Sequence, residues 1–219
     1  IKLGGSAMED PAALEATLQD VVFMETVGLH PVVVHGGGKP IDRAMAVAGL
    51  QPRKIQGRRY TDRATLDIVV RILLDDVNAG IVKHIRRLGG RAVGLHSGTL
   101  QCLFGQRLTL SGDDGQPTDL GYVGRVTRVE GDLIQDLCAG SVVPVIPSLA
   151  LEEGGEGWLN VNADTAAAAV AAHLRAEKFV LLTDTPGSLH DRHDPDSLLT
   201  HLDAEGCREL IGRGIIGEG

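Results

Sequence analysis

Short runs of β-branched and aliphatic residues recur along the chain, and segments with apolar residues at helical spacing separate them. The run at residues 32–34 is three valines without a polar interruption, which is typical of a strand buried on both faces of a parallel sheet. Similar runs predict strands at residues 91–95, 142–146 and 179–182. Strands that alternate with helices in this way predict an α/β fold whose central sheet is mainly parallel.

The segment before the valine run predicts a single helix. Asp10 supplies a capping carboxylate and Pro11 suits the first helical position, while Gly28 ends the periodic pattern. The crossover between two parallel strands is right-handed, so the turns that follow the two strands lie at one edge of the sheet. That edge is where open α/β sheets bind ligands.

Both of these strands end in a glycine-rich turn. Lys2 stands just before Gly4 and Gly5 in the first turn, and three consecutive glycines, residues 36–38, form the second. Glycines leave backbone N–H groups open to an anion, and a lysine adds a point charge suited to phosphate oxygens. A tight turn with no ligand would explain either motif alone. Two such turns on successive strands indicate that two anionic groups are brought face to face.

Thr61 and Asp62 can begin a long helix that runs to about His84. Its apolar residues are Leu66, Val69, Val70, Leu73, Leu74, Val77, Ile81 and Ile85. Because they wrap around more than one face, the helix is either deeply buried or packed against a second subunit. We favour the second interpretation, a homodimer formed through helix 61–84.

Two polar groups of residues flank these elements. Arg58 and Arg59 are either a solvent-exposed pair or a site where one guanidinium binds a carboxylate through two hydrogen bonds. Asn160, Asn162 and Asp164 alternate at a strand-to-helix junction. Asn162 or Asp164 alone is sufficient as a helix cap, so three amide or acid groups in five residues indicate a polar site.

Between residues 100 and 129 the pattern changes to short alternating runs, which are divided by the turn at 111–115. This pattern predicts a β-hairpin inserted beside the main sheet. We assign Asp113 and Asp114 to the turn in preference to a metal site. Farther along, residues 203–213 predict a last helix.

Composition narrows the class of protein. The chain has 219 residues, of which 43% are apolar, as in an ordinary globular protein. A net charge of −8 and a pI near 5.4 argue against a general nucleic-acid or anionic-membrane binder. No apolar run reaches the roughly 20 residues of a membrane span, and no signal peptide is visible. Three cysteines without C-x-x-C spacing fit a reducing cytoplasm and small apolar filler.

Motifs of several enzyme classes do not occur in the sequence. It lacks the P-loop pattern G-x-x-x-x-G-K-[ST]. Its one match to the dinucleotide pattern G-x-G-x-x-G, at residues 212–217, lies at the end of a predicted helix and not after a strand, so a dinucleotide fold is disfavoured. The eight histidines are scattered without zinc-binding spacing. We therefore assign no catalytic histidine.

Six short motifs follow one another in a distinctive order. They are Lys2-Leu3-Gly4-Gly5, His35-Gly36-Gly37-Gly38, Gly57-x-Arg59-x-Thr61, Ala92-Val93-Gly94-Leu95, Asn160-Val161-Asn162-Ala163-Asp164 and Leu182-Thr183-Asp184-x-x-Gly187. Their order and approximate separations resemble the amino-acid kinase superfamily over essentially the whole chain. Within it, Arg59 and the run at 160–164 resemble the branch that phosphorylates N-acetyl-L-glutamate.

The resemblance implies a three-layer αβα sandwich with a mainly parallel central sheet. It implies one domain, residues 1–219, in which 1–150 mainly bind the acyl-amino-acid substrate and 151–219 mainly bind the nucleotide. It further implies a homodimer, ATP and Mg²⁺, and phosphorylation of the side-chain carboxylate of N-acetyl-L-glutamate in arginine biosynthesis. A carboxylate is already ionised at neutral pH, which agrees with the lack of a histidine base.

The resemblance also implies residue roles, with no protein ligand to a metal. Lys2 would stabilise charge on the transferring phosphoryl group, and Asp164 would orient the catalytic lysines by charge pairing. The substrate-binding residues would be Gly37, Gly38, Arg59 and Asn160, with Arg59 on the α-carboxylate. The nucleotide-binding residues would be Gly4, Gly5, Thr183 and Asp184, with residues 214–219 near the adenine or phosphates.

The sequence departs from the superfamily pattern in three places. A second catalytic lysine stands a few residues beyond the position of Gly219, and we expect both ends of this chain to be cut. His96-Ser97-Gly98 and Lys39-Pro40 differ from the usual residues of the substrate rim. Two alternatives stay open: a related kinase acting on carrier-bound aminoadipate or glutamate, and a catalytically weak, ligand-binding regulatory homologue.

Overall fold

The computed structural model describes residues 1–5, 7–96, 98–111, 116–155, 157–183, 187–191, 193–194 and 196–216. The chain divides into two compact units, Ile1–Leu182 and Thr183–Gly219. The first unit contains all three sheets.

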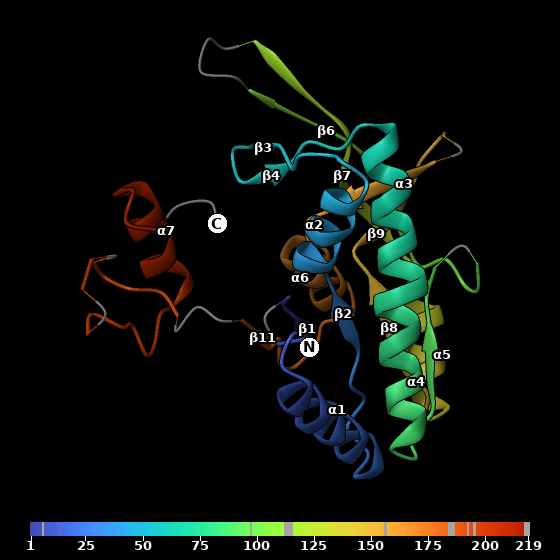
Figure 1. The fold of residues 1–219 in the computed structure, drawn as a ribbon. Coiled ribbons are helices and arrows are strands. Elements are labelled where there is room, and N and C mark those ends of the chain that lie inside the picture. The colour runs from blue at the N-terminus through green and yellow to red at the C-terminus, as the bar shows by residue number, and fades with distance from the viewer. Residues whose placement is uncertain are drawn as a thin grey trace. The chain divides into compact units, whose positions relative to one another are not determined.

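A five-stranded parallel sheet forms the centre of the first unit (Figure 1). In spatial order its strands are β11 (Leu181–Leu182), β1 (Lys2–Leu3), β2 (Val33–His35), β8 (Val143–Pro147) and β5 (Ala92–Gly94). All four neighbouring pairs are parallel. The predicted α/β fold with a parallel central sheet is confirmed.

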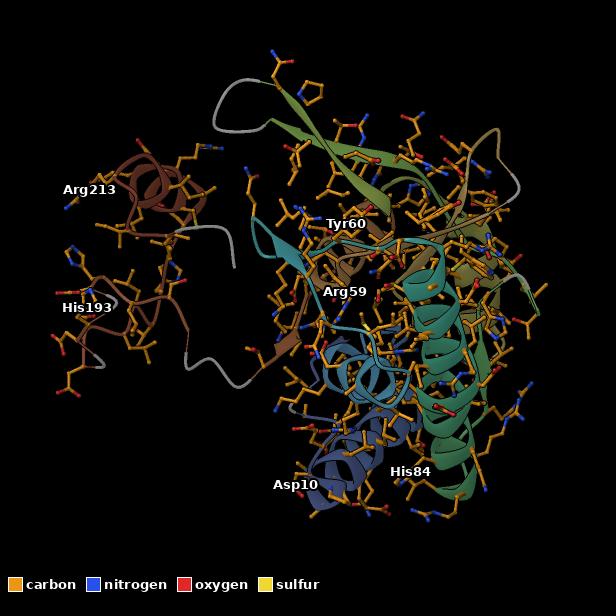
Figure 2. All side chains as sticks on the ribbon, turned by 45° about the horizontal axis from the view of Figure 1, so that its top comes forward. Asp10, Arg59, Tyr60, His84, His193 and Arg213 are labelled. Carbon is orange, nitrogen blue, oxygen red and sulfur yellow. The ribbon has the colours of Figure 1, made fainter. Side chains whose placement is uncertain are left out.

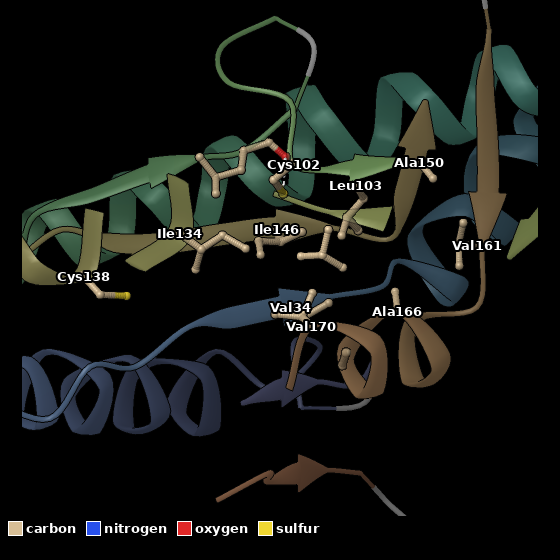
Figure 3. Packing of buried hydrophobic residues seen from close by; sticks show 13 residues of the cluster. Val34, Cys102, Leu103, Ile134, Cys138, Ile146, Ala150, Val161, Ala166 and Val170 are labelled. Carbon is tan, nitrogen blue, oxygen red and sulfur yellow. Dashed lines mark hydrogen bonds between the residues drawn. The ribbon is translucent and has the colours of Figure 1, made fainter. Parts of the chain in front are cut away.

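Helices cover both faces of this sheet. Helices α1 (Pro11–Thr26) and α4 (Ala79–Arg87) pack on one face, and α5 (Gly131–Ala139) and α6 (Ala163–His173) on the other. Val33 packs in the hydrophobic cluster on the α1–α4 face, and its neighbour Val34 packs in the cluster on the α5–α6 face. Figure 3 shows Val34 in this second cluster with Ile134, Ala166 and Val170. Successive strand residues point to opposite faces of the sheet. Because helices bury both faces, every residue of the strand packs in a core, which explains the uninterrupted valine run.

The first helix begins as predicted. The Asp10 side chain accepts hydrogen bonds from the backbone N–H groups of Ala12 and Ala13, and Pro11 is the first helical residue. Gly28 has φ +84°, a backbone conformation that favours glycine after the helix end. These local signals set the path from β1 to β2.

The predicted long helix consists of three consecutive segments: α3 (Arg63–Arg71), a π-helical segment η1 (Ile72–Asn78), and α4. Asp62 caps it by accepting a hydrogen bond from the Thr65 amide at 2.8 Å. Part of its apolar surface is buried inside the unit, because Leu66, Val69 and Leu73 are 0–2% exposed. The π-helical segment was not predicted.

The predicted hairpin is present as β6 (Leu103–Ser111) paired antiparallel with β7 (Pro117–Val129). It is also half of a closed second sheet, which β9 (Leu149–Glu152) and β10 (Trp158–Val161) complete in the order β10-β7-β6-β9. The turn residues Asp113 and Asp114 lie outside the described residues.

Two shorter elements lie near the second sheet. Strands β3 (Lys54–Ile55) and β4 (Arg58–Arg59) form a small antiparallel hairpin. Helix α2 (Gly38–Val47) follows the triple glycine. Together these elements frame the glycine-rich edge of the central sheet.

The interpretation of residues 179–182 as a buried strand was wrong. Only Leu181 and Leu182 are in strand β11, and Phe179, Val180 and Leu181 are 40–48% exposed. The physical reason is position: β11 is an edge strand that pairs with β1 alone.

The second unit contains helix α7 (Ala204–Gly212), as the sequence predicted. Asp203 caps it by accepting a hydrogen bond from the Gly206 amide at 2.7 Å, and Leu210 is buried. Across all the described residues, every helix falls short of the length and apolar character needed to cross a membrane.

Candidate active site

The two glycine turns lie side by side at one edge of the central sheet. In the parallel pair β1–β2, Lys2 is opposite Val34 and Leu3 is opposite His35, so both strands end at the same level. A Cβ placed on Gly5 would be 4.0 Å from the Lys39 backbone nitrogen, which shows how close the turns are. The predicted juxtaposition of the turns is confirmed.

Lys2 is the most deeply buried cation of this edge. Its residue is 8% exposed, and its Nζ lies 2.9 Å from the Oδ1 of Asp164, whose side chain is 52% exposed. A buried ammonium is stable only with such a partner. The Cβ position of Gly4 is 3.4 Å from the same Nζ, so the charge lies against bare backbone. The pair therefore holds a positive charge where a phosphate oxygen can reach it.

The three polar residues at the start of α6 have three separate functions. Asn162 is the helix cap and accepts hydrogen bonds from the Asp164 and Thr165 amides at 2.9 and 3.0 Å. Asn160 donates to the Thr61 hydroxyl at 3.1 Å. Asp164 pairs with Lys2. Capping thus accounts for one residue of the motif and leaves two for the site.

A cavity of about 200 Å³ opens beside the triple glycine. The residues predicted to bind substrate, Gly37, Gly38, Arg59 and Asn160, all line it. Gly37 is the N-cap residue of α2, and no side chain caps this helix end. The first backbone N–H groups of α2 therefore have no capping partner and lie at the cavity. Among the described residues that line the cavity none is acidic, whereas Lys54, Arg58 and Arg59 are cationic. The cavity suits an anionic ligand.

Arg59 extends from the β3–β4 hairpin to α2 (Figure 2). Its side chain is 10% exposed, and Nη1 lies 2.6 Å from the Oδ1 of Asp42. The same guanidinium donates to the Met45 sulfur at 3.2 Å and to the Gly38 carbonyl at 3.4 Å. Arg59 is therefore held firmly at the cavity, but much of its donor capacity is already used.

His35 and Asn78 form a buried polar network that the sequence did not reveal. They are 0% and 2% exposed, and the Asn78 amide nitrogen lies 3.0 Å from the His35 Nε2 and 3.0 Å from the Val145 carbonyl. An amide nitrogen only donates, so Nε2 accepts and Nδ1 carries the proton, which it donates to the Gly36 carbonyl at 3.1 Å. The network ties the π-helical segment to the triple-glycine turn.

Burial lowers the pKa of His35 to about 4, against an opposing contribution from its hydrogen bond to Gly36. The ring is therefore neutral at physiological pH and acts as a structural donor. Gly94 makes room for the network, because a Cβ on it would lie 2.0 Å from the Asn78 Oδ1.

The remaining residues predicted at the substrate rim and at the nucleotide site are considered next. Lys39 pairs with Glu9 at 2.6 Å, and Arg43 contacts the same carboxylate at 2.8 Å, so one negative charge balances only one of these two cations. Gly4 must be glycine, because a Cβ there would lie 2.7 Å from the Leu182 carbonyl oxygen. Thr183 directly follows β11, whereas Asp184 and residues 217–219 lie outside the described residues.

The described part of the chain contains no group of three or more His, Cys, Asp or Glu residues that could hold a metal ion. Burial raises the pKa of the Cys102 thiol to about 12 and that of Cys138 to about 11. These thiols are apolar filler, as expected from the sequence.

The chain is similar to known proteins in sequence and in structure. A sequence model of the amino acid kinase family matches residues 1–217. The chain is 43% identical to an acetylglutamate kinase of Heliobacterium modesticaldum, covering 100% of this chain and 75% of the relative. It is 42% identical to the Synechocystis acetylglutamate kinase, covering 100% and 71%. The solved structure of smu.665 from Streptococcus mutans superimposes with a TM-score of 0.83 at 28% identity, covering 100% and 83%.

The buried histidine makes stability depend on pH. The pKa of His35 in the unfolded chain is about 6.5, so below that pH the unfolded state binds a proton that the folded state does not. The free energy of unfolding should therefore fall by about 2 kcal/mol through this group between pH 7 and pH 5. Urea unfolding at both pH values measures it. The His35→Gln variant should lose about 2 kcal/mol less over this interval; an equal loss in both proteins would contradict the assignment.

Proposed function

The chain belongs to the amino acid kinase family, and from this premise we propose that it transfers the γ-phosphoryl group of ATP to the side-chain carboxylate of N-acetyl-L-glutamate. The product is an acyl phosphate, and the reaction is a cytoplasmic step of arginine biosynthesis. The relatives described above bear the name of this activity. The observation that carries the proposal is the position of the Lys2–Asp164 pair and of the cationic cavity on the same β1–β2 and α6 framework.

Transfer of a phosphoryl group between two anions depends mainly on positioning and on charge stabilisation. Lys2 supplies the charge at the transferring group, and Asp164 holds the ammonium in place at 2.9 Å. The substrate carboxylate is already ionised, so no residue needs to remove a proton. The neutral, fully buried His35 is consistent with a reaction that needs no general base.

The cavity supplies the acceptor side of the reaction. We assign the amides of Gly37 and Gly38 to the reacting carboxylate, since they open α2 beside the β1 turn. Arg59 and Asn160 bind the α-carboxylate and the N-acetylamino part of the substrate. Its volume of about 200 Å³ lies below the roughly 300–1,000 Å³ of pockets for drug-sized ligands, which limits the cavity to a small metabolite.

On the donor side, we assign Gly4, Gly5, Thr183 and Asp184 to ATP. Gly4 and Gly5 fit phosphate because their backbone is bare beside the Lys2 ammonium. When bound, Mg²⁺ neutralises charge on the phosphates. The described residues offer it no cluster of acidic ligands, which suits an ion held mainly by phosphate and water. The finer architecture belongs to this proposal: one αβα domain with a substrate half, 1–150, and a nucleotide half, 151–219.

Two alternatives are outcomes of the experiment below. A kinase for carrier-bound aminoadipate or glutamate would need a basic rim for an acidic carrier, and Glu9 balances one of the two cations Lys39 and Arg43 there. A regulatory homologue with weak catalysis would not need a buried, paired Lys2, which this chain retains.

Replacement of Lys2 tests the proposal. In a coupled ADP-release assay on the full-length gene product, N-acetylglutamate should support turnover, and glutamate and aminoadipate should not. Lys2→Ala should lower kcat about 100-fold or more, because it removes charge stabilisation from the transition state. Lys178→Ala, a change at an exposed lysine outside the site, should be neutral. An active Lys2→Ala enzyme would refute the role of Lys2, and no turnover with any acceptor would refute the kinase assignment.

We also propose that the protein is a homodimer through helix 61–84. Ile68, Val70 and Leu74 of this helix remain half-buried in the single chain, so they offer apolar area to a second copy. Sedimentation velocity should give the mass of a dimer, and Val70→Glu should shift it toward monomer. Val47→Glu, which places the same charge on a valine that is 92% exposed on α2, should leave the dimer intact. A monomer at all concentrations would contradict the proposal.

A further inference from the structure

The Thr61 side chain is buried between two polar residues of the site. The residue is 0% exposed, and a buried hydroxyl needs hydrogen-bond partners. The hydroxyl has two: its oxygen lies 2.9 Å from the Arg59 carbonyl oxygen and 3.1 Å from the Asn160 Nδ2. Arg59 and Asn160 both line the cavity of about 200 Å³, whereas Thr61 is not one of the lining residues that the structure describes. Thr61 therefore acts on the cavity through these two neighbours.

The backbone of Thr61 is held independently of its hydroxyl. The Thr61 N–H donates to the Leu120 carbonyl at 3.0 Å, and the Thr61 carbonyl accepts from the Tyr122 N–H at 2.7 Å. Gly121, between these two residues, has φ +71°, and a Cβ on it would lie 2.2 Å from the Thr61 carbonyl oxygen. The main chain thus fixes Thr61 against β7, so the hydroxyl is not needed to anchor the residue.

The hydroxyl has one proton, and its two partners decide where that proton lies. A carbonyl oxygen only accepts, so Thr61 donates its proton to Arg59. The hydroxyl oxygen then accepts from Asn160, which must offer its NH₂ group. The reverse orientation of the amide would place the Asn160 oxygen against a hydroxyl oxygen whose proton is already used. Thr61 therefore fixes which end of the Asn160 amide faces it.

The other end of this amide is the Asn160 Oδ1. It makes no hydrogen bond with any described residue, and it is not one of the buried atoms left without a partner. Because Asn160 lines the cavity, this accessible, unpaired oxygen faces the open volume. The cavity wall thus presents a hydrogen-bond acceptor here, and an acceptor favours a ligand group that can donate.

We propose that Thr61 is a positioning residue that makes the cavity selective for an N–H group on the substrate. Its hydroxyl holds the Asn160 NH₂ group and so directs Oδ1 toward the acetamido N–H of N-acetyl-L-glutamate. The inference rests on the proposed function, which assigns Asn160 to the N-acetylamino part of the substrate. An ester in the same place has an oxygen that only accepts, so the Oδ1 would lose its donor and face a second acceptor.

Calorimetric binding of two ligands to the full-length protein tests the inference. N-acetyl-L-glutamate carries the N–H, and (S)-2-acetoxyglutarate is the same molecule with an ester oxygen in its place. The unmodified protein should bind the amide about 10- to 100-fold more tightly than the ester, because the ester leaves a polar group of the complex unpaired. Thr61→Val keeps the shape of the side chain but lets the Asn160 amide turn, so this preference should fall below about threefold. Thr61→Ser, which keeps the hydroxyl, should retain the preference.

The ratio of the two affinities separates this role from a structural one. If the Thr61 hydroxyl only stabilised the cavity, Thr61→Val would weaken both ligands by the same factor and leave the ratio unchanged, and this result would overturn the inference. It would also be overturned if Thr61→Ser lost the preference, or if the unmodified protein bound the two ligands equally or bound neither.

A matched control is available on β7. Thr127 is an exposed threonine of this strand and is not among the described residues that line the cavity, so Thr127→Val should bind both ligands as the unmodified protein does. Failure of the proposed function looks different: the unmodified protein would prefer the amide over the ester but would not release ADP from ATP in the presence of the amide.

Discussion

The burial of one ammonium group constrains the whole site. Lys2 is placed in the central sheet, where its charge is stable only because Asp164 lies 2.9 Å away at the start of α6. This pair fixes the position of α6 relative to β1 across the edge that carries both glycine turns. The glycines then permit close approach: a Cβ on Gly36 would lie 3.1 Å from the Ala163 Cβ, and one on Gly37 would lie 2.7 Å from Leu73. The Lys2–Asp164 pair therefore depends on the close approach of α6 to the glycine turns, and that approach depends on the pair.

A second network supports the turn from behind. Asn78 leaves the helical run at the end of the π-helical segment and reaches His35, which in turn bonds the Gly36 carbonyl. Every group in this network is neutral, so it orients the turn without adding charge near the anions. The structure thus separates two tasks: neutral donors hold the backbone, and cations such as Lys2 and Arg59 lie where the ligands bind. That separation is consistent with phosphoryl transfer, in which position and field matter more than proton exchange.

The features that the sequence predicted are those that local chemistry determines. Valine runs, the Asp10 and Asp62 caps and the glycine turns each depend on a few neighbouring residues, and all are present. The features that it did not predict depend on distant partners. Nothing near Asn78 indicates His35, and Arg59 meets Asp42 only because the hairpin folds onto α2. Residues 179–182 have the composition of a buried strand, but their edge position in the sheet exposes them.

The most direct test of the central claim is to trap the product of the reaction. The full-length protein would be incubated with ATP, Mg²⁺, N-acetyl-L-glutamate and hydroxylamine, and the products identified by mass spectrometry. Phosphorylation of the side-chain carboxylate predicts an acyl phosphate, which hydroxylamine converts to the side-chain hydroxamate, with one ADP released for each hydroxamate. Release of ADP without hydroxamate, or a hydroxamate at the α-carboxylate, would contradict the placement of the reacting carboxylate at the glycine turns.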